Sequence, residues 1–191
     1  MNKITKKEIN FLGKKLVLES GELAMMANNA VKLTYGDTTV LATVVMGEPD
    51  SSIDFFDLRV HYDPKLFAAG LIKSSKYVKR DGKPTDEAVI TRRLIDHAIR
   101  PLFPKDFNNA IQVIVTVLSL DRDADPEFAA LLGVSAVLHS SQIPFYGPMT
   151  SVKVGLKDGT TIINPTKDES HHLDLNMIIS FSGKQRDFLA V

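Results

Sequence analysis

Residues 30–45 read A-V-K-L-T-Y-G-D-T-T-V-L-A-T-V-V, two β-rich runs separated by a glycine–aspartate pair. That arrangement predicts a tight hairpin with its turn at Gly36-Asp37. Further strands are predicted at 16–18 and 53–62, and the residues before them read as an exposed lead-in. The first third of the chain is therefore predicted to be antiparallel sheet.

A helix is predicted at 85–99. Thr85 suits the N-cap, and the two acidic residues that follow it favour the positive end of the helix dipole. The helix stops before Pro101, because a residue that precedes proline disfavours helical geometry. Arg92 is placed to pair with Asp96 one turn later. The apolar face is assigned to Val89, Ile90, Leu94, Ala98 and Ile99.

The second half of the chain continues with a nearly unbroken β-branched run at 111–120, which predicts a strand buried on both faces. A second helix is predicted to begin with Asp125 as its N-cap and Pro126 as its first residue. The remaining strands are predicted at 152–156, 161–163, 175–181 and 188–191. This order predicts one α+β domain over residues 1–191, with antiparallel and mixed sheets packed against helices.

Composition and charge exclude several classes of protein. The 191 residues include no cysteine, so disulfide frameworks and thiolate metal sites are excluded. No apolar run approaches the ~20 residues of a membrane span, and the start lacks a secretory signal, so a cytoplasmic protein is predicted. Net charge is zero, yet residues 73–105 hold nine Lys/Arg against four acids. This excess of five positive charges predicts a local contact with a polyanion, the alternative being a solvated surface.

One acidic motif suggests different chemistry. Asp121-x-Asp123-x-Asp125 follows a buried strand, as in magnesium-dependent phosphohydrolases that use the first Asp as nucleophile and the second as acid/base. The strand–helix alternation of those enzymes is missing here. The preferred interpretation is that Asp125 caps a helix and that the other two acids are solvated or bind nearby basic residues. His171-His172 lacks the spacing of a helical zinc site and reads as a polar loop.

Several segments, in order, resemble the first RNase PH-type domain of the polynucleotide phosphorylase family. They are L-V-L-E-S-G-E-L-A at 16–24, Y-G-D-T-T-V-L-A-T-V-V at 35–45, I-D-F-F-D-L-R-V-H-Y at 53–62, A-A-G at 68–70, K-R-D-G-K-P-T-D at 79–86, R-L-I-D-H-A-I-R-P-L-F-P at 93–104, I-P-F-Y-G-P at 143–148 and I-N-P-T at 163–166. The resemblance covers nearly the whole chain. The 93–104 string, together with the G-D-T hairpin, is the most specific part.

The resemblance implies phosphorolytic 3′→5′ degradation of RNA, with release of nucleoside diphosphates and use of inorganic phosphate and Mg²⁺. It implies a homotrimeric ring, single-stranded RNA as substrate and proteins of RNA-degradation complexes as partners. The chain would hold only the first domain of the family's polypeptide. That domain's C-terminal helix and the second RNase PH, KH and S1 domains would be absent. Neither metal nor phosphate is expected to bind this domain.

The resemblance also locates the position at which the family's active domain binds phosphate, the start of a helix. Here that position reads Asp125-Pro126-Glu127. Proline removes an amide donor, and two carboxylates repel phosphate. The domain is therefore expected to be non-catalytic.

Asp168 and Asp174 carry the alternative, a stand-alone phosphorolytic enzyme. They have the six-residue spacing of the family's two catalytic aspartates. An alignment without gaps, however, places Thr166 and His172 at the catalytic positions, so the two aspartates are expected not to be catalytic.

The role that the resemblance implies for this non-catalytic domain is RNA binding. Tyr77, Lys79 and Arg80 fall in the family's aromatic and basic loop at the ring entrance, where RNA is bound by stacking and phosphate contacts. Arg93 and Arg100 match arginines of the following helix. They are expected either to bind RNA phosphates or to hold a domain interface.

Overall fold

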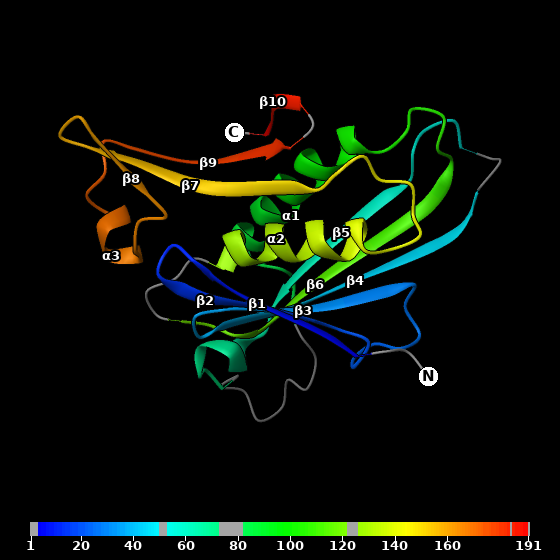
Figure 1. Cartoon of the computed structure of the whole chain (residues 1–191), viewed down its shortest axis with the longest axis horizontal. Helices are drawn as coiled ribbons and strands as arrows, with labels where there is room; N and C mark the ends of the chain where they lie inside the picture. Colours follow the sequence, from blue (N-terminus) through cyan, green and yellow to red (C-terminus); the bar gives the residue numbers. More distant parts are fainter. Residues whose placement is uncertain (1–3, 50–52, 73–81, 122–125, 184, 191) are drawn as a thin grey trace.

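The computed structural model describes residues 4–49, 53–72, 82–121, 126–183 and 185–190. Two β-sheets enclose two long helices (Figure 1). The predicted α+β class is confirmed, and the core is the apolar material between the layers.

The larger sheet, sheet A, has six strands in the order β1-β2-β3-β4-β6-β5. Their bounds are β1 Thr5–Phe11, β2 Lys14–Ser20, β3 Asn29–Tyr35, β4 Thr38–Pro49, β5 Leu58–Pro64 and β6 Asn109–Ser119. All neighbours are antiparallel except β5 and β6, which are parallel. The purely antiparallel first third was therefore a wrong prediction. Helix α1 connects the parallel pair, and a parallel pair needs such a crossover.

The predicted hairpin is confirmed as β3–β4, with Tyr35 opposite Thr38. Gly36 has a φ of 59°, in the left-handed region that suits glycine. The exposed lead-in expected before residue 16 is exposed but forms a strand, since Thr5–Phe11 pairs with β2 as β1. Every residue from Thr5 to Asn10 is exposed, so no buried alternating face marks this strand in the sequence.

Helix α1 spans Asp86–Ile99, and the Thr85 hydroxyl caps it by accepting the Ala88 N–H at 3.2 Å. The predicted bounds are confirmed, and the predicted apolar face is confirmed at Ala98 and Ile99 but wrong at Ile90. Ile90, assigned to the core, is 64% exposed. The residues that α1 buries are Ala88, Thr91, Ile95, Ala98 and Ile99. This face combines the small residues Ala88 and Ala98 with the large Ile95 and Ile99, and all four belong to the core.

Helix α2 spans Pro126–His139 and lies between the two sheets (Figure 1). Its start at Pro126 confirms the prediction, while Asp125 lies outside the described residues. A β-carbon at Gly133 would stand 3.3 Å from a methyl of Val40 and 3.5 Å from the β-carbon of Ala42 on β4. The absence of a side chain thus lets α2 approach sheet A closely. On its other side, the Ser135 hydroxyl accepts the Met149 N–H at 2.9 Å.

The smaller sheet, sheet B, has the antiparallel order β10-β9-β7-β8. Its strands are β7 Met149–Lys157, β8 Thr160–Ile163, β9 Leu175–Ser182 and β10 Gln185–Ala190. The shorter helical elements are η1 Leu66–Ala69, η2 Arg100–Leu102 and α3 Lys167–Ser170. In the described part of the chain, no helix has the length and apolar character needed to cross a membrane.

Candidate functional site

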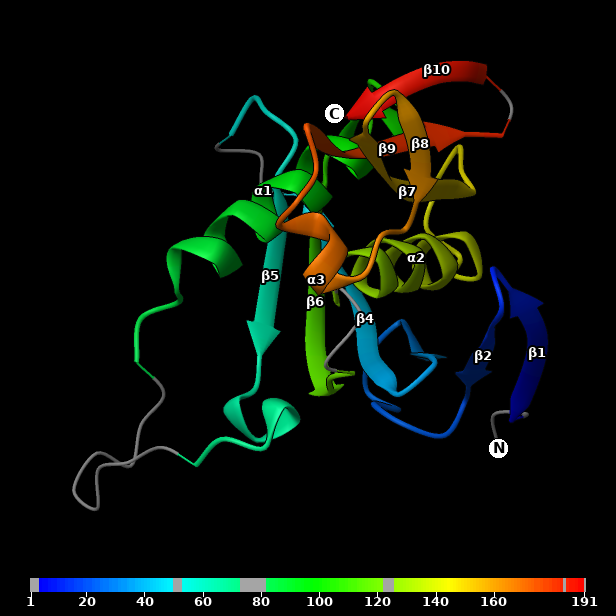
Figure 2. The same cartoon turned by 90° about the vertical axis from the view of Figure 1, so that its left-hand side faces the viewer.

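A groove of about 510 Å³ runs between β5, an edge strand of sheet A, and helix α1. Figure 2 shows the two elements side by side. The lining residues are Leu58, Arg59, Val60, His61, Arg92, Arg93, Asp96 and His97. Strand β5 contributes because its residues alternate between the core and solvent, which leaves Arg59 and His61 exposed. Helix α1 contributes the face opposite its buried one.

The groove carries an excess of positive charge. Asp96 is the one acidic residue of its lining, and the guanidinium of Arg100 binds that carboxylate at 2.8 and 3.2 Å. Arg59 pairs with Asp57 at 2.8 Å. Arg92 and Arg93 make no hydrogen bond or ion pair with any residue that the structure describes. Two guanidinium groups are therefore available to an anion, and the predicted Arg92–Asp96 pair was wrong.

Arg100 is held by contacts within the domain. Besides its two bonds to Asp96, it donates to the carbonyl oxygens of Phe56 and Leu58 at 3.3 and 3.4 Å. Its guanidinium also lies 5.8 Å from the centroid of the Phe56 ring, within cation–π range. These contacts fix the start of β5 to the end of α1. The predicted contact of Arg100 with RNA or with a domain interface stays a prediction. Arg93, the other helix arginine predicted to make such a contact, forms no hydrogen bonds of this kind with the described residues.

A second hollow, a cleft of about 830 Å³, lies at the start of α2. Its lining includes the carboxyl-bearing residues Glu87, Asp121 and Glu127, together with Lys153 and Tyr62. Glu127 is in the first turn of α2 and accepts a hydrogen bond from the Thr91 hydroxyl at 3.0 Å. Pro126 has no amide N–H to offer an anion. At this helix start proline removes one amide donor and Glu127 adds a carboxylate, and both features disfavour an anion such as phosphate.

Asp121, the first acid of the predicted phosphohydrolase motif, is in the same cleft. Its carboxylate pairs with the Lys14 ammonium at 3.0 Å, and its amide donates to the Thr38 hydroxyl at 3.1 Å. This pair fits the interpretation of Asp121 as a partner of a basic residue. Asp123 lies outside the described residues.

The sequence profile that matches this chain is RNase PH, described as the 3′ exoribonuclease family, domain 1, and the match covers residues 13–144. The match spans more than half of the chain.

The chain belongs to the RNase PH family.

Curated relatives agree with this family. A polyribonucleotide nucleotidyltransferase of Alkaliphilus oremlandii is 47% identical over 181 residues, covering 94% of this chain and 25% of the relative. One of Rhodospirillum centenum is also 47% identical over 181 residues, covering 94% of this chain and 26% of the relative. The chain thus spans about a quarter of the length of these relatives.

A solved structure agrees at the level of the fold. Rice Rrp46 superimposes with a TM-score of 0.70 at 18% sequence identity, covering 91% of this chain and 76% of the rice chain. At this identity the likeness establishes a shared fold and nothing about chemistry.

In this RNase PH domain the two aspartates of the alternative site lie on opposite sides of a turn. Asp168 is in α3, and Asp174 precedes β9 and accepts the Asp158 N–H at 3.1 Å. Thr166, which the ungapped alignment placed at a catalytic position, is the N-cap of α3 and exchanges hydrogen bonds with Glu169. These bonds lower the pKa of the Glu169 carboxyl. The described residues contain no group of three His, Asp or Glu that could hold a metal ion.

The predicted RNA-binding loop of the RNase PH domain, with Tyr77, Lys79 and Arg80, lies outside the described residues. Sequence analysis missed the β5 wall of the groove, Arg59 and His61. A signal was available: in Leu58-Arg59-Val60-His61-Tyr62, apolar residues alternate with basic ones, which predicts a strand with one cationic face.

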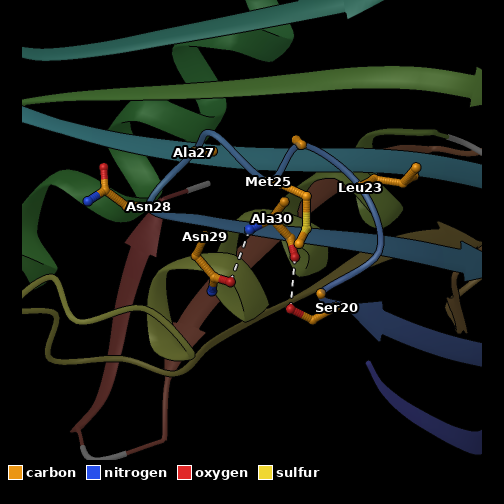
Figure 3. A pocket seen from close by; sticks show the side chains of 9 residues that line it. Ser20, Leu23, Met25, Ala27, Asn28, Asn29 and Ala30 are labelled. Carbon is orange, nitrogen blue, oxygen red and sulfur yellow. Dashed lines mark hydrogen bonds between the residues drawn. The ribbon is translucent and has the colours of Figure 1, made fainter. Parts of the chain in front are cut away.

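A third, small pocket of about 230 Å³ lies in the loop between β2 and β3 (Figure 3). Two asparagine side chains hold the loop in place by hydrogen bonds. The Asn28 side chain accepts the Met46 N–H at 2.8 Å, and the Asn29 amide donates to the Val137 carbonyl oxygen at 2.8 Å. Figure 3 shows Leu23, Met25 and Ala27 along the same loop. The pocket has no ionisable side chain in its lining, so its asparagines serve loop structure.

Proposed function

We propose that this chain is the N-terminal RNase PH-type module of a phosphate-dependent 3′→5′ exoribonuclease, a polyribonucleotide nucleotidyltransferase. In this proposal the module binds single-stranded RNA and takes part in ring assembly, while phosphorolysis takes place elsewhere in the longer polypeptide. The observation that carries the RNA-binding role is the groove between β5 and α1, where Arg92 and Arg93 have no acidic partner among the described residues.

The groove suits a phosphodiester backbone for electrostatic reasons. Its one carboxylate, Asp96, is neutralised by Arg100 from within the domain, so Arg92 and Arg93 act on a ligand without an opposing charge. Guanidinium groups bind phosphate oxygens through two parallel N–H donors. Contacts of this kind are independent of base sequence. Tyr77, Lys79 and Arg80 are proposed as further RNA-binding residues, and they lie outside the described residues.

The cleft at the start of α2 supports the non-catalytic role. A phosphorolytic site must hold inorganic phosphate, and Glu127 together with Pro126 at the helix start disfavours that anion. Mg²⁺ and phosphate are proposed as ligands of the whole enzyme and not of this module. A cytoplasmic homotrimer that meets other proteins of RNA degradation is the corresponding proposal for the whole enzyme.

The decisive experiment is incubation of the chain with labelled RNA, inorganic phosphate and Mg²⁺, followed by chromatography of the products. We expect RNA binding without release of nucleoside diphosphates. Release that Asp174→Asn abolishes would overturn the proposal in favour of the stand-alone enzyme with Asp168 and Asp174. Phosphate-ester hydrolysis that Asp121→Asn abolishes would instead establish the phosphohydrolase.

A further inference from the structure

The groove between β5 and α1 holds two histidines besides its arginines. His61 lies on β5 and His97 on α1, and both side chains are exposed to solvent. Neither imidazole forms a hydrogen bond or an ion pair with a described residue. Histidine is the side chain whose charge ordinarily changes between about pH 5 and pH 8. The positive charge of the groove is therefore not fixed, because two of its side chains gain a proton as the pH falls.

Each histidine lies near an arginine of its own element. On β5, His61 and Arg59 are two residues apart, so both side chains project from the same side of the strand at a spacing of about 7 Å. On α1, His97 follows Arg93 by four residues, which places the two side chains one turn apart on one face of the helix. Each wall of the groove therefore carries one permanent cation and one side chain that becomes a cation on protonation.

No carboxylate in the described part of this neighbourhood is free to neutralise the protonated histidines. Three aspartates lie on or beside the walls, and each is already held by a cation of the same domain. The pairs are Asp57 with Arg59, Asp63 with Lys65, and Asp96 with Arg100. On β6, the position beside His61 is the uncharged Ile114. Glu127 of α2, which also packs against α1, accepts a hydrogen bond from Thr91 on the buried side of the helix.

A phosphate group is the counter-ion that fits these protonated side chains. A protonated imidazole donates from both ring nitrogens, and a charge-assisted hydrogen bond to phosphate is about twice as strong as a neutral one. Without an anion, a charge on either imidazole adds to those of Arg92 and Arg93 in the same groove. A bound phosphodiester backbone supplies the opposite charge. RNA binding and proton binding in the groove therefore favour each other, as thermodynamic linkage requires.

We infer that His61 and His97 are further phosphate-binding residues of the groove in their protonated form. RNA binding there is coupled to proton uptake and tightens as the pH falls from about 8 to about 5.5. This inference rests on the proposed RNA binding by the groove and goes beyond it, because it assigns two more contacts and makes the affinity depend on pH. A groove that used its arginines alone would bind RNA equally at both pH values.

The test measures the affinity of the chain for oligo(U), because uracil carries no group that titrates in this range. Fluorescence anisotropy gives the affinity at pH ~8 and pH ~5.5, each at several salt concentrations. The wild type is compared with His61→Gln combined with His97→Gln, which stays neutral, and with His61→Arg combined with His97→Arg, which stays charged. The matched control is His139→Gln combined with His171→Gln, since these exposed histidines lie outside the groove.

We expect the wild type and the control to bind oligo(U) more tightly at the lower pH. One more phosphate contact adds about 0.7 to the salt slope, which is about fivefold in affinity at ~0.1 M salt relative to ~1 M, so two contacts give about 25-fold. The glutamine variant should keep the weaker affinity at both pH values, and the arginine variant the tighter one. Calorimetry in buffers of different ionisation enthalpy should show proton uptake on binding in the wild type and none in either groove variant.

Equal affinity of the wild type for oligo(U) at both pH values would overturn this inference and leave RNA binding by the groove intact. A gain at low pH that persists in the glutamine variant would also overturn it, since the titrating groups would then lie elsewhere. If oligo(U) bound at neither pH, the proposed RNA binding by the groove would fail, and this inference with it.

Discussion

Arg100 shows how a single residue can be assigned a role by its contacts. It stands where α1 ends, and all of its partners belong to the same domain: Asp96 on the helix, and the Phe56 and Leu58 carbonyls before and at the start of β5. The planar guanidinium serves these acceptors together, which a single ammonium point charge cannot do. Arg93, two turns earlier on the exposed face, has no such partners among the described residues.

The first prediction concerns the guanidinium group of Arg100. Arg100→Lys should lower the free energy of unfolding by about 1–2 kcal/mol, because the carbonyls of Phe56 and Leu58 lose their donors while Asp96 keeps a cation nearby. Urea unfolding of the variant measures the change. Arg92→Lys is the matched control, since Arg92 has no partner in the described structure to lose. A loss of the same size in both variants would contradict the structural role of Arg100.

At the scale of the element, α1 shows that the start of a helix and its buried face are determined by different contacts. Its start is local, because the Thr85 hydroxyl needs only the Ala88 N–H three residues on. Its buried face is not local, because β5 and α2 decide which side is covered. Thr91 is 2% exposed and donates to the Glu87 carbonyl and to the Glu127 carboxylate, so a polar residue lies on the buried side.

The second prediction concerns the cap of α1. Thr85→Ala should lower the free energy of unfolding by about 1 kcal/mol, because the first turn loses the acceptor of the Ala88 N–H. Thr85→Ser keeps the hydroxyl and should stay close to wild type. Denaturant titrations of the three proteins provide the measurement, and an alanine variant as stable as the serine variant would show that the hydroxyl does not cap the helix.

The third prediction concerns the ion pairs that hold β1 to β2 and β2 to β3. A hydrogen bond from Lys15 lowers the pKa of Glu8, and one from Lys32 lowers the pKa of Glu19. A folded-state pKa below the unfolded value means that the stabilisation is present above the unfolded value and is lost as pH falls through the folded one. Amide exchange of β1 should therefore accelerate, relative to the core strands, as the pH falls below the ordinary range of glutamate.

The double substitution Glu8→Gln and Glu19→Gln should remove this pH dependence and leave β1 exchanging faster at neutral pH. Glu48→Gln is the control, because Glu48 forms no ion pair with a described residue. High salt should weaken the effect, since these groups are near the surface. A ratio of β1 exchange to core-strand exchange that does not change with pH in wild type would contradict the prediction.

At the scale of the whole molecule, the groove exists because β5 and α1 meet side by side at the edge of sheet A. The arginines of its walls are more than thirty residues apart in sequence, and the parallel β5–α1–β6 crossover brings them together. The same fold directs the apolar sides of β5 and α1 into the core, so the cationic sides face each other across the groove.

The fourth prediction concerns this groove. Arg92→Ala combined with Arg93→Ala should weaken binding of single-stranded RNA of any sequence and make its salt dependence shallower by about 0.7 per lost phosphate contact. Affinity for poly(A) measured over a range of salt concentrations gives the slope. Lys7→Ala, at the exposed opposite edge of sheet A, should leave the slope unchanged. An unchanged salt dependence in the double variant would show that the groove is a solvated surface that does not bind RNA.

Much of the fold could be predicted because its signals are local. The hairpin at Gly36, the start of α1 at Thr85 and the start of α2 at Pro126 each depend on a few neighbouring residues, and all three agree with the structure. Strand β1 could not be recognised, because its exposed charged residues show no buried face. Of the candidate site, Arg93 was predicted, while Arg59 and His61 were missed since nothing near them in sequence indicates α1 as their neighbour.

The sequence by itself determined the family and the α+β class. It also determined that Asp125-Pro126-Glu127 stands where the family's active domain binds phosphate, since residue identity alone decides which groups can donate to an anion or repel it. Only the tertiary structure decided the parallel pairing of β5 with β6 and the pairing of Arg100, and not Arg92, with Asp96. The physical reason is that strand pairing, side-chain partners and burial depend on contacts between residues far apart along the chain, and the free energy of those contacts belongs to the folded molecule as a whole.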